Sequence, residues 1–64
     1  MPKMKLKALR INKELSRDQV AEFVGVSPGT VKNWELGVTF PKQPHIMLLC
    51  ELYDVEYDYI DFSK

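Results

Sequence analysis

Three polar side chains within four residues, Thr30, Lys32 and Asn33, are of the types that hydrogen-bond the edges of nucleic-acid bases. An asparagine amide offers a donor and an acceptor together, which suits N6 and N7 of adenine. A threonine offers a hydroxyl or a methyl for thymine, and a lysine reaches guanine or a phosphate. At 100° per residue in a helix, these side chains point away from the apolar Val31. The sequence therefore predicts a helix whose inner face packs on a core and whose outer face can contact bases.

A two-helix motif is expected to position that face. Ser16 and Gln19 have the spacing of a capping box, which opens a helix. Gly25 stands where this helix must stop, because glycine enters the left-handed conformation at little cost. Ser27 then caps the second helix, and Pro28 falls at its first position, where no N–H is needed. A helix, a glycine-bearing turn and a second helix over about residues 16–36 form a helix-turn-helix, a motif that inserts its second helix into a DNA major groove. The apolar residues at helical spacing in the first of the two helices are Val20, Phe23 and Val24.

The rest of the chain predicts an all-α fold, a compact bundle of four to five short helices in one domain over residues 1–64. In the first helix Leu6 and Leu9 face inward, and Leu15 closes onto the core after it. The tail VEYDYIDF alternates and could be a strand instead of a helical turn. The expected helices outside the motif cover about residues 3–13, 43–53 and 58–62. In the second of these the inward stripe is Ile46, Leu49, Cys50 and Tyr53.

Composition argues against several other classes of protein. A single cysteine excludes an internal disulfide and fits a reducing cytoplasm. The longest apolar run, Ile46–Cys50, is far short of the ~20 residues that cross a bilayer, and no apolar segment typical of a signal peptide follows the first lysines. His45 and Cys50 are five residues apart on a helix and cannot chelate one ion. Because no phosphate loop or nucleophile elbow is present, we expect no catalytic residue, metal, cofactor, membrane contact or small-molecule ligand.

The formal net charge is zero, but the charges are unevenly distributed. Residues 1–42 hold eight basic and four acidic side chains, whereas residues 43–64 hold one basic and five acidic ones. This division indicates one face for phosphate and another turned away from it, although ordinary surface charge explains it equally well.

Several residues of the chain occur in the order typical of a known family: Leu9-Arg10, Leu15-Ser16, Ala21, Gly25-Val26-Ser27, Trp34-Glu35, Gly37 and Pro41. This set, over residues 6–60, resembles the phage repressor and Cro-type (XRE-like) helix-turn-helix family. The resemblance implies a last helical turn in the tail and base contacts from Pro28, Gly29, Thr30 and Asn33, to which the wheel adds Lys32. Many relatives carry long polar side chains where Pro28 and Gly29 stand, so we expect close backbone approach and more reading of DNA shape here.

Other residues are expected to hold phosphate or to support the motif. Arg17 occupies the site where the family usually carries a phosphate-binding glutamine, and it shares with Gln19 the first turn of a helix, where N–H groups attract anions. Lys42 precedes a later helix and has the same role. The resemblance also implies a buried ion pair between Arg10 and Glu35 that orients the second helix of the motif.

The tail is rich in apolar residues, and we expect it to provide a dimer contact. Its residues are Tyr53, Tyr57, Tyr59, Ile60 and Phe62. The function expected is that of a small phage or mobile-element repressor that occupies a double-stranded operator of two half-sites, as a weak homodimer or a dimer formed on DNA. A protein-interaction module that has lost DNA binding, and an architectural or excision DNA-binding protein, remain as alternatives.

Overall fold

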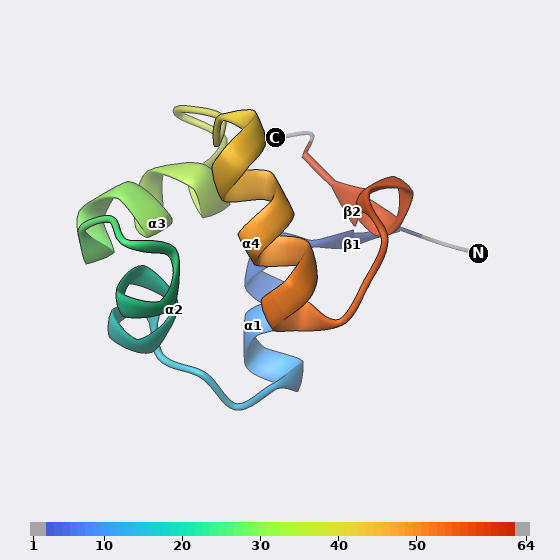
Figure 1. Cartoon of the computed structure of the whole chain (residues 1–64), viewed down its shortest axis with the longest axis horizontal. Coiled ribbons are helices and arrows are strands. Elements are labelled where there is room, and N and C mark those ends of the chain that lie inside the picture. The colour runs from blue at the N-terminus through green and yellow to red at the C-terminus, as the bar shows by residue number, and fades with distance from the viewer. Residues whose placement is uncertain (1–2, 63–64) are drawn as a thin grey trace.

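The computed structural model describes residues 3–62, which form four α-helices, one 3-10 turn and one pair of two-residue strands. Figure 1 shows α2 and α3 on one side of the molecule, α4 across its middle and the strands on the other side. The expected all-α bundle with a helix-turn-helix is confirmed. In chain order the elements are β1 (Met4–Lys5), α1 (Leu6–Asn12), α2 (Arg17–Val24), α3 (Pro28–Leu36), α4 (Gln43–Tyr53), η1 (Tyr57–Tyr59) and β2 (Ile60–Asp61).

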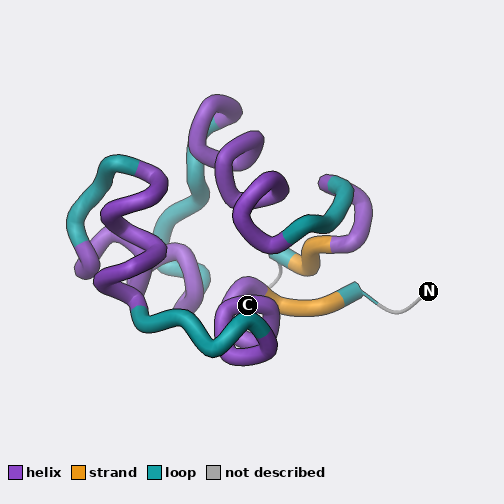
Figure 2. Tube along the Cα trace, turned by 60° about the horizontal axis from the view of Figure 1, so that its bottom comes forward, coloured by secondary structure: helices purple, strands orange, loops and turns teal. Residues whose placement is uncertain are grey.

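The first and last described segments pair with each other. β1 and β2 are parallel, with Met4 opposite Ile60 and Lys5 opposite Asp61, and they lie side by side in both views (Figures 1 and 2). The expected helix over residues 3–13 therefore starts too early, because the backbone of its first residues is extended and pairs with the tail. The tail itself contains both a helical turn, η1, and a strand, β2.

Local side-chain chemistry sets the ends of α2. The Ser16 hydroxyl accepts from the Gln19 N–H at 3.1 Å, and the Ser16 N–H donates to the Gln19 side-chain oxygen at 2.8 Å. This reciprocal capping box satisfies backbone donors that the first helical turn leaves unpaired. Gly25 ends α2 with a φ of 90°, in the left-handed region that favours glycine. The turn between α2 and α3 is thus fixed by residues within it.

α3 is bounded in the same manner. Ser27 caps it by accepting from the Thr30 N–H at 3.2 Å, and Pro28 occupies its first position. Gly37 ends the helix with a φ of 78°. The Val38 N–H then donates back to the Asn33 carbonyl at 3.0 Å, which folds the following loop onto the end of α3.

The core lies where all four helices meet the tail. Its buried residues are Leu6, Leu9, Val20, Ala21, Val24, Val31, Trp34, Leu49, Tyr53 and Ile60. Of the three apolar residues at helical spacing in α2, Val20 and Val24 are buried, whereas Phe23 is 45% exposed and Ala21 completes the inner face instead. Ile46 is only half-buried, whereas Cys50 packs against the core as expected.

The structure corrects the expected dimer contact in the tail. Tyr53 and Ile60 are core residues with about 2% of their surface exposed, so neither is available to a partner. Ile60 is buried because β2, paired beside β1, brings it into the core, and Tyr53 because it faces inward from the last turn of α4. Tyr59 is half-buried, and the rings of Tyr57 and Phe62 lie 5.8 Å apart against each other. The apolar surface that the tail offers is therefore much smaller than the sequence suggests.

Candidate nucleic-acid interface

The outer face of α3 carries the residues predicted to contact bases. Pro28, Gly29, Lys32 and Asn33 are exposed, and Thr30 is half-buried. The Thr30 hydroxyl lies 2.9 Å from the Ser27 hydroxyl and so takes part in capping the helix. The exposed hydrogen-bonding side chains of this face are therefore Asn33 and Lys32, while Thr30 retains its methyl and the remaining capacity of its hydroxyl.

Glu35, on the inner side of α3, joins three helices through its carboxylate. Arg10 of α1 donates from Nε to Glu35 Oε2 at 2.8 Å and from Nη2 to Oε1 at 3.4 Å. Arg17 of α2 donates from Nε to the same Oε1 at 3.2 Å. Arg10 also donates from Nη1 to the Leu15 carbonyl at 2.9 Å, which ties the end of the α1–α2 connection to the cluster. The pair that the resemblance implies is thus present, with a second arginine added to it.

Burial strengthens the ion pairs of this cluster. The Glu35 side chain is 2% exposed and that of Arg10 is 13% exposed, so their attraction is little screened by water. Two cations on one carboxylate leave one unit of positive charge, and Arg17, 35% exposed, is the partner nearer to solvent. The cluster therefore fixes α3 relative to α1 and α2 and presents its surplus charge at the first residue of α2.

Tyr53 of α4 lies close enough to this cluster for the charges of Glu35 and Arg10 to change its pKa. Burial, the larger cause, and the negative charge of Glu35 together raise the pKa of Tyr53 to about 12, against the positive charge of Arg10, which lowers it. α4 is also held by its first turn, where the His45 ring lies 5.4 Å from the ring of Trp34. The ring contact joins the first turn of α4 to the inner face of α3 and so supports the orientation of the exposed face.

The residues predicted to hold phosphate lie at two helix N-termini. Arg17 and Gln19 are in the first turn of α2, and Lys42 is the exposed N-cap residue of α4. The Gln19 oxygen is occupied by the capping box, so a phosphate would meet its amino group. Lys42 makes no side-chain cap bond with α4, whose first turn contains no acidic residue. Cationic side chains and free N–H groups at helix starts favour anions.

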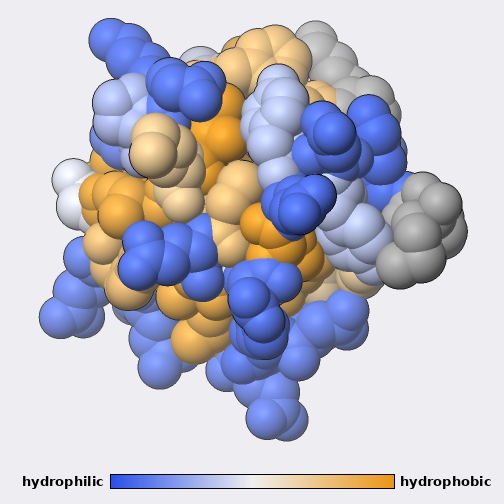
Figure 3. Space-filling view, turned by 45° about the vertical axis from the view of Figure 1, so that its right-hand side comes forward, coloured by the Kyte–Doolittle hydropathy of each residue, from blue (hydrophilic) through white to orange (hydrophobic). Residues whose placement is uncertain are grey.

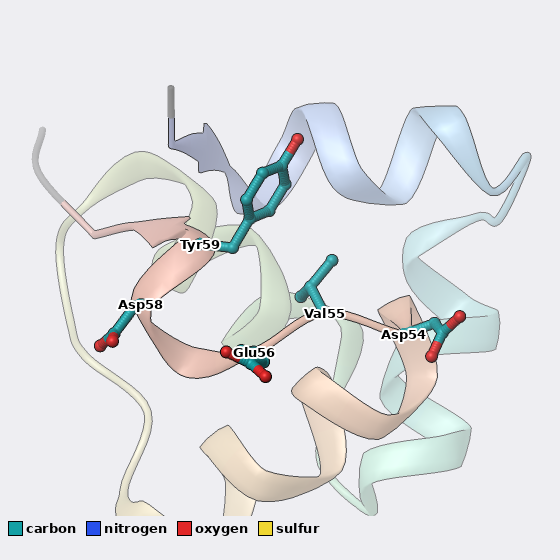
Figure 4. A pocket seen from close by; sticks show the side chains of 5 residues that line it. All are labelled: Asp54, Val55, Glu56, Asp58 and Tyr59. Atoms are coloured by element: carbon teal, nitrogen blue, oxygen red, sulfur yellow. The ribbon is translucent and has the colours of Figure 1, made fainter. Parts of the chain in front are cut away.

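The acidic tail forms a separate feature. An open hollow of about 550 Å³ is lined by Asp54, Val55, Glu56, Asp58 and Tyr59. The Asp54 and Asp58 carboxylates lie at opposite ends of it and do not converge (Figure 4). Among residues 3–62, no group of three His, Cys, Asp or Glu side chains is arranged to hold a metal ion. None of the helices in this range is long and apolar enough to cross a bilayer.

Of two features of the interface, one could not be found from the sequence, whereas the other was close to what the sequence predicts. The bond from Arg17 to Glu35 joins residues 18 positions apart, and it depends on the angle at which α2 crosses α3. The Thr30–Ser27 contact was closer to prediction, because a serine three residues before a threonine is a capping arrangement.

Comparison with known proteins gives one match. A family model described as helix-turn-helix matches residues 6–60, which include α1 to α4, η1 and the first residue of β2. No curated protein and no solved structure matches the chain.

Proposed function

Because the chain belongs to the helix-turn-helix family, whose members are DNA-binding transcription regulators, we propose that it is a small sequence-specific repressor that acts by occupying an operator. α3 enters the major groove with Asn33 and Lys32 at base edges, and Pro28 and Gly29 bring its backbone close to the DNA. No catalytic step belongs to this function. The protein acts in the cytoplasm, which is compatible with a lone free cysteine.

The observation that carries the proposal is the Glu35 cluster. Regulators of this kind need a recognition helix that is held rigidly while its outer face stays free. Glu35 receives hydrogen bonds from α1 and α2, and the Asn33 side chain, two residues earlier, is exposed. Burying a carboxylate costs free energy unless it is paired and hydrogen-bonded, and the two arginines that pair with Glu35 also orient α3.

Phosphate contacts set the register of the complex. Arg17 keeps its guanidinium aligned by donating Nε to Glu35, so its two terminal amino groups remain for a phosphate oxygen. Lys42 supplies a second contact at the start of α4. The phosphate contacts do not depend on the DNA sequence, whereas Asn33 discriminates between bases.

The experiment is a comparison of three variants on two kinds of duplex: sites selected from a random library and mixed-sequence DNA. Asn33→Ala is expected to lose about 1–3 kcal/mol on the selected site and to relax preference at one base pair. Arg17→Ala is expected to weaken both duplexes alike and to reduce the salt slope by about 1. Lys7→Ala, which removes an exposed cation of α1, is the matched control and is expected to change neither.

If Asn33→Ala and Arg17→Ala give the same profile across sequences, the division of roles is wrong. A chain that binds no duplex at all is instead a protein-interaction module on the same fold. An architectural protein would bind duplex without a preferred site in the selection.

A further inference from the structure

The exposed face of α3 has one side chain suited to the amino group of adenine. Pro28 and Gly29 have no hydrogen-bonding group in their side chains, and Lys32 has donors but no acceptor. The Asn33 amide has both, and the side chain is exposed. Among residues 3–62 this amide has no hydrogen-bond partner, so its donor and its acceptor are both available to a base.

Thr30 is a poor substitute for Asn33 in this contact. Its hydroxyl lies 2.9 Å from the Ser27 hydroxyl, whose oxygen also accepts from the Thr30 N–H at 3.2 Å. Part of the capacity of the Thr30 hydroxyl is therefore used in the helix cap. A hydroxyl also presents one atom, whereas an amide presents two at the spacing of adenine N6 and N7. Bidentate recognition of adenine thus depends on Asn33 alone.

The position of the Asn33 amide is fixed by the rest of the fold. Its own backbone carbonyl accepts from the Val38 N–H at 3.0 Å, at the end of α3. Two residues later, Glu35 accepts from Arg10 at 2.8 Å and from Arg17 at 3.2 Å. α3 therefore cannot shift outward without breaking buried bonds, and the amide has only its own side-chain torsions with which to avoid an obstacle on the base.

A methyl group on adenine N6 is such an obstacle. The methylated amino group keeps one hydrogen, which pairs with thymine, so the methyl group takes the place of the hydrogen that faces the major groove. The Asn33 oxygen of a bonded amide would lie ~2.9 Å from N6, and the methyl carbon lies ~1.45 Å from N6 along the same direction. About 1.5 Å would remain between carbon and oxygen, where even a close C–H···O contact needs ~3.3 Å. Methylation therefore removes the hydrogen bond and also excludes the amide oxygen.

The opposite side of the molecule offers no second surface suited to bases. The strands lie away from α3 (Figure 1), and in the view turned toward them hydrophilic side chains interrupt the hydrophobic areas (Figure 3). The tail on that side carries Asp54, Glu56 and Asp58, whose negative charges repel phosphate. Contact with the edge of an adenine is therefore expected from α3.

We propose that Asn33 makes operator binding sensitive to methylation of adenine at N6, so that the protein binds the unmethylated operator and rejects the methylated one. This inference rests on the proposed function, to which it adds regulation of the base contact by a covalent mark on the DNA. Pro28, Gly29 and Lys32 provide no second acceptor for the adenine amino group, so no neighbouring side chain compensates for the lost contact.

The test uses a single selected half-site in two forms. One form has adenine, and the other N6-methyladenine, at the base pair where Asn33→Ala relaxes preference. The intact protein is expected to bind the methylated form about 5- to 150-fold more weakly, which corresponds to the loss of one bidentate contact. Asn33→Ala is expected to bind both forms equally, because it has no amide to exclude. A half-site methylated at an adenine outside that base pair controls for the effect of methylation on the duplex itself and is expected to bind normally.

Lys32→Ala is the matched control variant, since Lys32 is exposed beside Asn33 on the same helix. It is expected to weaken binding to both forms by the same factor and so to keep the effect of methylation, with circular dichroism checking the fold of each variant. Equal binding of the two forms by the intact protein, or an effect of methylation that persists in Asn33→Ala, overturns the inference and leaves the proposed function standing. A selected site with no adenine at the base pair that Asn33 reads does the same. Absence of binding to any duplex overturns both.

Discussion

Replacing Arg10 with methionine tests how strongly the Glu35 carboxylate holds α3 in place. The substitution keeps most of the aliphatic stem of Arg10 but removes its two bonds to Glu35 and its bond to the Leu15 carbonyl. Breaking a buried pair by removing one partner costs about 3–5 kcal/mol. Arg17 stays on the same carboxylate, so we expect the free energy of unfolding to fall by somewhat less, about 2–3 kcal/mol.

This loss is large for so small a domain. At about 0.05–0.15 kcal/mol per residue, a chain of this length has about 3–10 kcal/mol of stability in total. A change of 1 kcal/mol shifts the melting temperature of such domains by about 4–8 °C, so Arg10→Met is expected to melt roughly 10–20 °C lower. The assay is a thermal melt followed by circular dichroism, with urea unfolding to confirm the free energy.

Arg17→Met and the double variant complete the test. Arg17 is more exposed than Arg10, so its removal alone is expected to cost under about 1 kcal/mol. Removing both arginines leaves Glu35 nearly buried without a cation and is expected to cost more than the two single changes together. Lys7→Met, on the exposed surface of α1, is the control. An Arg10→Met melt that matches the wild type would refute the reasoning, as would strict additivity of the two arginines.

Three further predictions concern single residues. Ser27→Ala removes the acceptor for the Thr30 N–H and is expected to lower stability by ~1 kcal/mol in urea unfolding; an unchanged midpoint would mean that the cap is unimportant. Gly29 has space for a Cβ, because the side-chain oxygen of Ser27 would lie 3.9 Å away. Gly29→Ala is therefore expected to stabilise the helix by up to ~1 kcal/mol and to weaken DNA binding, since the methyl group holds the backbone away from the DNA. A variant both more stable and equally tight on DNA would contradict that approach. Because burial raises the pKa of Tyr53 from 10.0 to about 12, the unfolded chain ionises first, and stability is expected to fall between pH 10 and 12, by up to about 3 kcal/mol. Urea unfolding of Tyr53→Phe at both pH values should show a smaller fall, and an identical fall would exclude Tyr53 as its source.

The sequence predicted best what depends on residues close in the chain. The capping box of Ser16 and Gln19, the stop at Gly25 and the start at Ser27 and Pro28 all use partners within three or four positions. Local geometry of this kind does not depend on how distant parts of the chain pack. The helix-turn-helix was therefore predictable with nearly the bounds observed.

What the sequence could not predict depends on contacts between distant residues. β1 pairs with β2 across more than fifty residues, which shortens α1 at its start and buries Ile60. A helical repeat alone did not distinguish Phe23 from Ala21, because both flank the inner stripe of α2. The bond from Arg17 to Glu35 likewise depends on how two helices cross. For the interface, residue types indicated which side chains face outward, but packing decided how Arg17 and Thr30 are held.

Salt dependence of binding to duplex DNA tests the central claim most directly. The interface has two exposed or part-exposed cations per copy that are proposed to hold phosphate, Arg17 and Lys42. Each phosphate neutralised contributes about −0.9 to the slope of log K against log salt concentration. Two copies on a two-half-site duplex are therefore expected to give a slope of about −4, and a single copy about −2. A slope near zero, or no binding to any duplex at low salt, would contradict DNA binding by this face.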